Sequence, residues 1–139
     1  MTFNEFKEEV VGKCKRADAC EPEFKKLLHA KTERQLWTVL LSNYTWCKNN
    51  NIFNKMPDSF VFDEDFNGNI FLSGCDLTGI TLPINVSGFL DLGRCNLKGI
   101  VLPKTVGISL YVGGCNLEGV ELPVVEKYIY NEKGSYSQK

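Results

Sequence analysis

The sequence predicts an α+β protein in which an N-terminal α-helical cap is followed by a short β-solenoid. Residues 60–123 repeat with a period of 20 residues, which is typical of solenoid architectures. Within each repeat, apolar residues alternate with other residues over short stretches that glycine or proline interrupts, as expected of short strands joined by turns. Residues 1–55 instead place apolar residues at helical spacing behind capping residues.

Three segments, 74–83, 94–103 and 114–123, define the repeat and align without insertion or deletion. The aligned columns hold Cys75, Cys95 and Cys115; Leu77, Leu97 and Leu117; Gly79, Gly99 and Gly119; Leu82, Leu102 and Leu122; and Pro83, Pro103 and Pro123. One period earlier, the apolar columns hold Phe60, Phe62, Phe66, Ile70 and Leu72. The repeat therefore predicts three to four coils of 20 residues, each burying its apolar side against its neighbours.

A chain that turns about every five residues closes one coil after four sides, and stacked coils about 4.8 Å apart pair side by side. Alternation such as Leu90-x-Leu92 then points like side chains inward, one above another. One side departs from the pattern, because Asn67, Ser87 and Gly107 occur around the position where a central Leu is expected. We expect that side to be flattened or irregular.

The repeat also resembles known families. Residues 75–79, 95–99 and 115–119 resemble pentapeptide repeats, in which a small residue and a central Leu point inward. The wider unit, Leu-Pro-x₂-Val-x₃-Leu-x-Leu-x-Gly-Cys-x-Leu, resembles solenoid repeats of phage and mobile-element proteins. Residues 17–50 resemble helical leaders of phage-type proteins. These resemblances imply a β-solenoid and an origin in a phage or mobile element.

The N-terminal helices have clear start signals. Thr2-x-x-Glu5 predicts a capping box, and Pro22 suits the first turn of a second helix after a break. Thr32-x-x-Gln35 predicts a second capping box that opens the longest helix, whose end is marked by three asparagines at 49–51. The apolar stripe of that helix consists of Leu36, Trp37, Leu40, Leu41, Tyr44 and Cys47.

These patterns divide the chain into a helical module at 1–55, a solenoid module at 56–130 and a flexible tail at 131–139. No apolar run of 18 or more residues occurs, so we expect no membrane span. The first residues are acidic and lack an apolar signal region, so we expect no signal peptide. The predicted location is the cytoplasm of a bacterial host cell.

The chain contains 6 cysteines, and three of them fall on the repeat. Without an export signal, buried free thiols are a better interpretation than disulfides, because a reduced cysteine packs as a small hydrophobe. A zinc site is also disfavoured, since no Cys-x₂-Cys pair occurs and the only histidine is His29. We expect no metal and no cofactor.

The sequence offers little for catalysis. His29 has no serine or cysteine motif beside it, and the run Asp63-Glu64-Asp65 is typical of a solvated turn. Gly113-Gly114 lacks the strand-to-helix context of a phosphate-binding loop. The net charge of -1 is not that of a direct nucleic-acid binder. We therefore expect a protein that is not an enzyme.

Two surfaces are candidates for partner binding. If Leu90 points inward, then Phe71, Asp91 and Tyr111 point outward, one above another, with Phe89 at the adjoining corner; exposed aromatic patches usually mark interfaces. The alternative is that Phe71 is covered by the helical cap. The second candidate is an acidic surface whose members are Asp63, Glu64, Asp65, Glu118 and Glu121.

The predicted function is a non-catalytic protein-binding module, most concretely a phage- or mobile-element-encoded inhibitor of a host defence protein such as a CRISPR effector (an anti-CRISPR). The partner would be a host protein or a nucleic-acid-processing complex, with no direct contact to nucleic acid or membrane. One alternative is a structural or assembly protein that self-associates through the solenoid, for example as a homodimer through the terminal coil. Another is an acidic DNA mimic that blocks a DNA-binding enzyme, although lysines and an arginine interrupt the acidic surface.

Overall fold

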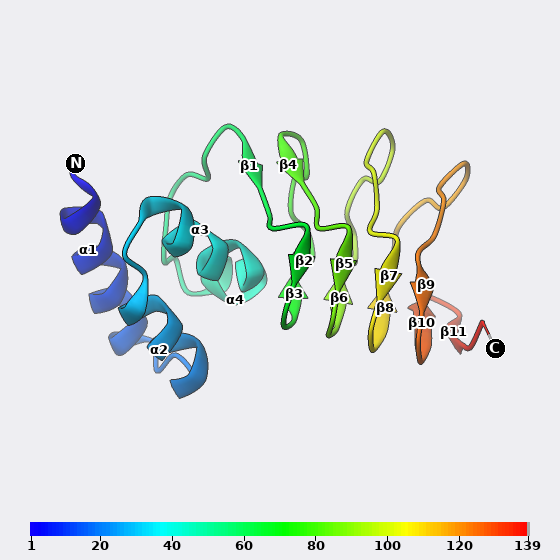
Figure 1. Ribbon diagram of the computed structural model, residues 1–139, viewed down its shortest axis with the longest axis horizontal. Helices are drawn as coiled ribbons and strands as arrows, with labels where there is room; N and C mark the ends of the chain where they lie inside the picture. Colours follow the sequence, from blue (N-terminus) through cyan, green and yellow to red (C-terminus); the bar gives the residue numbers. More distant parts are fainter. Residues whose placement is uncertain (139) are drawn as a thin grey trace. The chain divides into compact units, whose positions relative to one another are not determined.

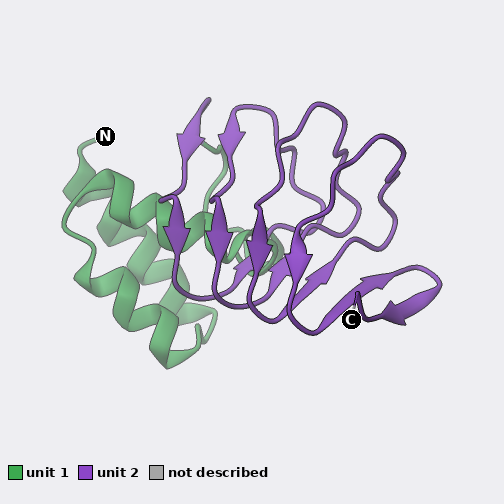
Figure 2. Cartoon of the chain, turned by 45° about the vertical axis from the view of Figure 1, so that its right-hand side comes forward, with its two compact units in different colours: residues 1–56 green, residues 57–139 purple. Residues whose placement is uncertain are grey.

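The structure, a computed structural model, describes residues 1–138 and has the predicted α+β architecture. Two compact units divide the chain, at Met1–Met56 and Pro57–Lys139 (Figure 2). The first unit contains the α-helices. The second contains parallel-stranded sheets wound into a β-solenoid of about 4 turns (Figure 1), as the repeat predicts.

The helical unit contains α1 (Phe3–Arg16), α2 (Glu21–His29), α3 (Glu33–Ser42) and α4 (Tyr44–Asn49). The first capping box is confirmed: the Thr2 hydroxyl accepts a hydrogen bond from the Glu5 N–H at 3.1 Å, and Glu5 accepts one from the Thr2 N–H at 3.4 Å. Pro22 lies in the first turn of α2, as predicted. The described helices include none that is long and apolar enough to cross a membrane.

The prediction of a single long helix after Thr32 is wrong. The helix is interrupted at Asn43, which separates α3 from α4. The backbone of Asn43 leaves the helical region (φ -118°, ψ 32°), and its side-chain amide donates to the Val39 carbonyl and to Glu23 of α2. A short polar side chain that bonds nearby backbone competes with helix continuation. The second capping box is also incomplete, since Gln35 accepts from the Lys31 N–H rather than from Thr32.

Helix packing in this unit is centred on aromatic contacts. The rings of Phe6 and Trp37 stack at 5.4 Å, and Trp37 meets Phe53 edge-on at 5.1 Å. The Lys7 ammonium donates to the carbonyls of Leu28 and Ala30 at the end of α2, where a positive charge complements the helix dipole. These contacts tie α1 to α2 and α3.

The solenoid unit consists of short strands that pair across successive coils. They are β1 (Phe60–Val61), β2 (Asp65–Phe66), β3 (Ile70–Phe71), β4 (Ile80–Thr81), β5 (Asn85–Val86), β6 (Leu90–Asp91), β7 (Thr105–Val106), β8 (Ser109–Tyr111), β9 (Val124–Val125), β10 (Tyr128–Asn131) and β11 (Gly134–Tyr136). Their sheets have the orders β1-β4, β2-β5-β7-β9 and β3-β6-β8-β10-β11. All pairs are parallel except β10 with β11, which is antiparallel.

The solenoid core consists of the apolar columns that the alignment predicts. Ile70, Leu90 and Leu110 stack in register and are fully buried. Leu77 and Leu97 are each 2% exposed, while Leu117 near the last coil is partly exposed. Each coil therefore buries its leucines against the coils on either side, which is the source of stability in a repeat stack.

The 20-residue period ends after Pro123. The earlier coils pair at an offset of 20, as in Val86 with Val106, whereas Val106 pairs with Val125 and Leu110 with Ile129, an offset of 19. One residue is missing between Pro123 and β9, where the earlier coils have Ile84 and Lys104. The fourth coil thus continues the core with Val125 and Ile129, both buried.

The corners that follow β3, β6 and β8 explain why cysteine and glycine recur in their columns. The thiols of Cys95 and Cys115 donate to the carbonyls of Leu72 and Leu92, one coil earlier, at 3.1 and 3.0 Å. Gly79, Gly99 and Gly119 have φ between 72 and 81°, a conformation that glycine adopts without strain. The cysteines are therefore inward-facing thiols that satisfy corner carbonyls.

The residue after each cysteine makes a further corner contact. Asp76, Asn96 and Asn116 each accept a hydrogen bond from the N–H two residues later, at 3.0 to 3.1 Å. Such turns favour Asp and Asn because their short side chains reach back to the backbone. The restriction of this column to Asp and Asn therefore has a structural cause.

The segment 131–139, expected to be a flexible tail, contributes Asn131 to β10 and forms β11. Beyond β11, the Gln138 side chain lies along the last edge of the β9 sheet. Its amide accepts from the Val125 N–H at 2.7 Å and donates to the Pro123 carbonyl at 2.9 Å. A side-chain amide therefore occupies the hydrogen-bonding groups that the backbone of a further coil would use.

Candidate protein-binding surface

The outer face of the β3-β6-β8-β10 sheet carries the residues predicted to bind a partner. Leu90 is fully buried, so the next residue, Asp91, faces outward by strand alternation. The pairing register places Phe71 beside Asp91, and Asp91 beside Tyr111. These three predicted site residues therefore lie in adjacent strands on one face.

The same face continues onto the fourth coil, whose tyrosines were not among the residues predicted to bind a partner. Tyr130 pairs beside Tyr111, and the rings of Tyr128 and Tyr130 lie 6.1 Å apart. Tyr128 is 47% exposed. We name the aromatic strip as Phe71, Phe89, Asp91, Tyr111, Tyr128 and Tyr130.

The two phenylalanines of the aromatic strip form a stacked pair. The ring centroids of Phe71 and Phe89 are 5.9 Å apart with an interplanar angle of 29°. Both side chains are half-buried. The pair offers a fixed apolar surface beside Asp91, and two stacked rings lose less freedom on binding than separate ones would.

Tyr111 lies across two glycines. A Cβ added at Gly93 would come within 2.7 Å of the Tyr111 ring, and one added at Gly113 would come within 2.6 Å of the Tyr111 hydroxyl oxygen. Both glycines are buried, whereas Tyr111 remains 38% exposed. The glycines therefore form a shelf on which the tyrosine ring lies while it stays partly exposed.

Asp91 is the only carboxylate of the aromatic strip. It is half-buried, and its carboxylate accepts a hydrogen bond from the Gly93 N–H at 2.9 Å. Burial raises the pKa of Asp91 above its usual range, although the Gly93 hydrogen bond opposes the shift. The aromatic strip thus contains a partly desolvated acid between aromatic residues.

The acidic residues of the second candidate surface are not brought together. Asp63, Glu64 and Asp65 lie in the first coil, whereas Glu118 and Glu121 lie around the corner that leads into the fourth. All five are exposed, and the exposed Lys98 and Lys104 lie between the two groups along the stack. The acidic surface is therefore divided in two.

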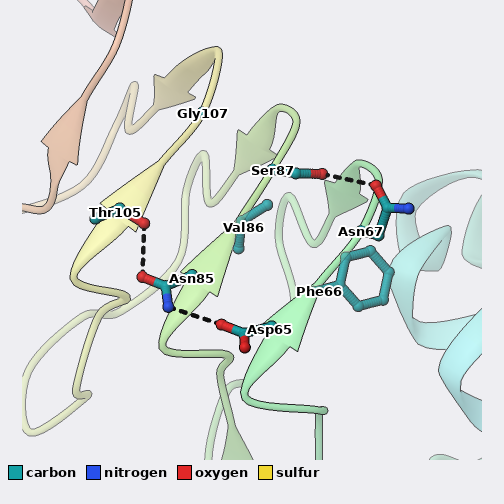
Figure 3. A pocket seen from close by; sticks show the side chains of 8 residues that line it. All are labelled: Asp65, Phe66, Asn67, Asn85, Val86, Ser87, Thr105 and Gly107. Atoms are coloured by element: carbon teal, nitrogen blue, oxygen red, sulfur yellow. Dashed lines mark hydrogen bonds between the residues drawn. The ribbon is translucent and has the colours of Figure 1, made fainter.

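The side of the coil that carries Asn67, Ser87 and Gly107 contains a groove of about 300 Å³ on the β2-β5-β7 sheet (Figure 3). Asp65, Asn85 and Thr105 form one row: the Asn85 amide donates to Asp65 and the Thr105 hydroxyl donates to Asn85, both at 2.7 Å. The groove is lined by these residues with Phe66, Asn67, Val86, Ser87 and Gly107. The strands of this side nevertheless pair in register from β2 to β5 to β7, so the expected irregularity is not found in the strand pairing.

The second row of the groove is formed by Asn67, Ser87 and Gly107. The Ser87 hydroxyl donates to Asn67 at 3.1 Å and accepts from the Gly68 N–H at 2.9 Å. A Cβ at Gly107 would lie 2.1 Å from the Ser87 carbonyl oxygen, so only glycine permits this approach. Since the polar groups bond one coil to the next, we interpret the groove as a ladder that stabilises stacking.

The cysteines have the environments of structural thiols. Burial raises the pKa of Cys95 to about 11 and that of Cys47 to about 12. Cys115 is less buried, and its pKa is raised mainly by the same cause. A thiol with a raised pKa forms little of the reactive thiolate at neutral pH. Cys20 alone among the six cysteines is exposed.

Searches of protein-family models, curated proteins and solved structures return no match to this chain. Within residues 1–138, no group of three or more His, Cys, Asp or Glu side chains is arranged to hold a metal ion. His29 is exposed at the end of α2. The aromatic strip is therefore the candidate site that the geometry itself singles out.

Proposed function

We propose that residues 57–139 act as a non-catalytic binding module that takes up a protein partner on the aromatic strip. One observation carries the proposal: the coil register sets Phe71, Tyr111 and Tyr130 on one outward face, with Phe89 and Tyr128 beside them. Partly exposed aromatic rings of this kind provide most of the binding energy in many protein interfaces.

The fold supports this use of the surface. The inward columns hold the backbone of each coil in place, so the outward rings other than Phe89 are carried on paired strands rather than on loops. A preorganised surface pays less ordering entropy on binding. A partner could therefore gain affinity from a few ring contacts.

A capture experiment with matched variants tests the proposal. Phe89→Ala combined with Tyr111→Ala removes one ring from the stacked pair and the ring on the glycine shelf. Val101→Ser is the control, because Val101 is 85% exposed on another side of the coil. All three chains, immobilised, are incubated with a bacterial lysate, and captured proteins are compared by mass spectrometry.

The proposal predicts a protein that the wild-type and Val101→Ser chains capture and that the double variant binds at least about tenfold more weakly. Circular dichroism must show that the double variant is folded. If the double variant retains every specifically captured protein, the aromatic strip is not the binding surface.

The finer hypothesis is that the partner is a host defence protein, such as a CRISPR effector, which this chain inhibits. Its support is the resemblance of the repeat and of the helical leader to phage-type proteins. Inhibition would be supported if the proteins captured by the wild-type chain but lost in the double variant include a CRISPR effector or another nucleic-acid-processing enzyme. Recovery of this chain alone would instead support self-association through the solenoid.

A further inference from the structure

Asp91 is an unusual residue to find at the centre of an apolar surface. Among residues 1–138 no cation pairs with its carboxylate, and only one of its oxygens has a hydrogen-bond donor, the Gly93 N–H. Burial disfavours the charged form of this acid. A neutral residue would fit the free protein better, so the carboxylate is best explained by a partner that compensates it.

The surroundings of Asp91 indicate the chemistry of that partner. Phe71 lies in the adjacent strand on one side and stacks on Phe89, which precedes Asp91 by two residues, while Tyr111 lies on its glycine shelf in the adjacent strand on the other side. A cation that pairs with the carboxylate would therefore lie close to aromatic rings in both neighbouring strands, where ring quadrupoles add to the attraction. A neutral donor would gain no such contribution.

A planar cation suits this position better than a compact one. A guanidinium group stacks on aromatic rings and is more weakly hydrated than an ammonium, so its transfer from water costs less. Its N–H groups also donate a charge-assisted hydrogen bond to the carboxylate oxygen that Gly93 leaves open. These properties distinguish arginine from lysine.

We propose that the aromatic strip recognises an arginine side chain of the partner protein, which pairs with Asp91 between the phenylalanine pair and Tyr111. The proposal rests on the proposed protein-binding function and names the group that the surface selects. The remaining members of the strip, Tyr128 and Tyr130, then contact the partner around that arginine.

Nuclear magnetic resonance tests the proposal directly, because the Gly93 amide bonded to Asp91 reports on the carboxylate. The full ¹⁵N-labelled chain is titrated with N-acetyl-arginine amide, and with N-acetyl-citrulline amide as the neutral isostere. We expect a saturable shift of the Gly93 signal with a Kd on the order of 10 mM for the arginine compound only. A lysine analogue should bind several-fold more weakly.

Two variants complete the test. Asp91→Asn keeps an acceptor for the Gly93 N–H and should abolish the arginine response. Asp76→Asn, which alters a carboxylate bonded to the Thr78 N–H outside the aromatic strip, should leave it intact. The proposal is overturned if the Gly93 signal does not shift at arginine-probe concentrations well above the expected Kd, if the citrulline compound shifts it equally, or if Asp91→Asn responds as the wild-type chain does.

The capture experiment separates this proposal from the function on which it rests. Loss of the partner in Phe89→Ala/Tyr111→Ala, together with full retention in Asp91→Asn, would keep protein binding on the aromatic strip and refute arginine recognition. Retention of the partner in the double variant would refute the proposed function itself. Loss in both variants, with Asp76→Asn unaffected, is the result that we expect.

Discussion

Truncation of Leu97 is expected to destabilise the solenoid strongly. Leu97 is 2% exposed and lies in the column between Leu77 and Leu117. Leu97→Ala removes three carbon atoms, and at about 0.8 kcal/mol for each buried methylene the transfer cost is about 2.4 kcal/mol. The cavity left between two neighbouring leucines adds to it, so we expect a total loss of about 3–5 kcal/mol.

Urea unfolding followed by hydrogen exchange of the β6 and β8 amides measures this loss in the solenoid unit itself. Residue-level exchange is needed because both tryptophans, Trp37 and Trp46, lie in the helical unit and their fluorescence reports on that unit. Leu117→Ala, at a partly exposed position of the same column, should cost markedly less. A Leu97→Ala loss below about 1 kcal/mol, or equal losses for both variants, would refute the assigned coil register.

Three further predictions follow from individual residues. At pH 8, a thiol reagent should label the exposed Cys20 quickly and Cys95 only after denaturant, since burial raises the pKa of Cys95 to about 11; equal native labelling rates would contradict a buried column. Because the folded-state pKa of Asp91 is raised above its ordinary 3.8, its contribution to stability is present below that value and is lost as pH rises through the folded pKa. In urea unfolding across this window, Asp91→Asn should remove that part of the pH dependence, whereas a profile identical to that of the wild-type chain would show that Asp91 is well solvated. Arg94 has φ 58° in the column where the other coils have Gly74 and Gly114. Arg94→Gly relieves about 1–2 kcal/mol of backbone strain and adds about 0.4–1 kcal/mol of conformational entropy to the unfolded chain, so we expect a slightly more stable protein. A lower melting temperature would contradict this.

Much of the solenoid was predictable because the residues of each column recur at 20-residue intervals in the sequence. Identical spacing of Cys75, Cys95 and Cys115, and of the leucines two positions later, indicates stacked coils without any knowledge of turns. The inward orientation of Leu90 and Leu110 follows from alternation alone. Periodicity is a reliable signal here since every coil must repeat the same packing.

Other features depend on single residues that a periodic pattern does not reveal. The fourth coil falls within the predicted three to four, but its offset of 19 residues was not predicted, because one residue is absent after Pro123 and this shifts Val125 and Ile129 out of the 20-residue columns. The helix break at Asn43 depends on hydrogen bonds to Val39 and Glu23, and the second partner is distant in sequence. Local propensity does not contain such tertiary contacts.

The candidate site was predictable in part. Strand alternation places Phe71, Asp91 and Tyr111 on one outward face, and the pairing register agrees with that placement. The shelf formed by Gly93 and Gly113 beneath Tyr111 was not foreseen, although the two aligned glycines were the available signal. The partial desolvation of Asp91 depends on the packed rings around it, so it could be found only from the structure.

Site-specific photocrosslinking tests whether the aromatic strip contacts the partner. A benzophenone-bearing phenylalanine analogue is placed at Tyr111, 38% exposed on the aromatic strip, or at Val101, 85% exposed on another side of the coil. On illumination in lysate, we predict a specific crosslinked partner from position 111 and none from position 101. Equal crosslinking at both positions, or crosslinking from position 101 alone, would contradict the account.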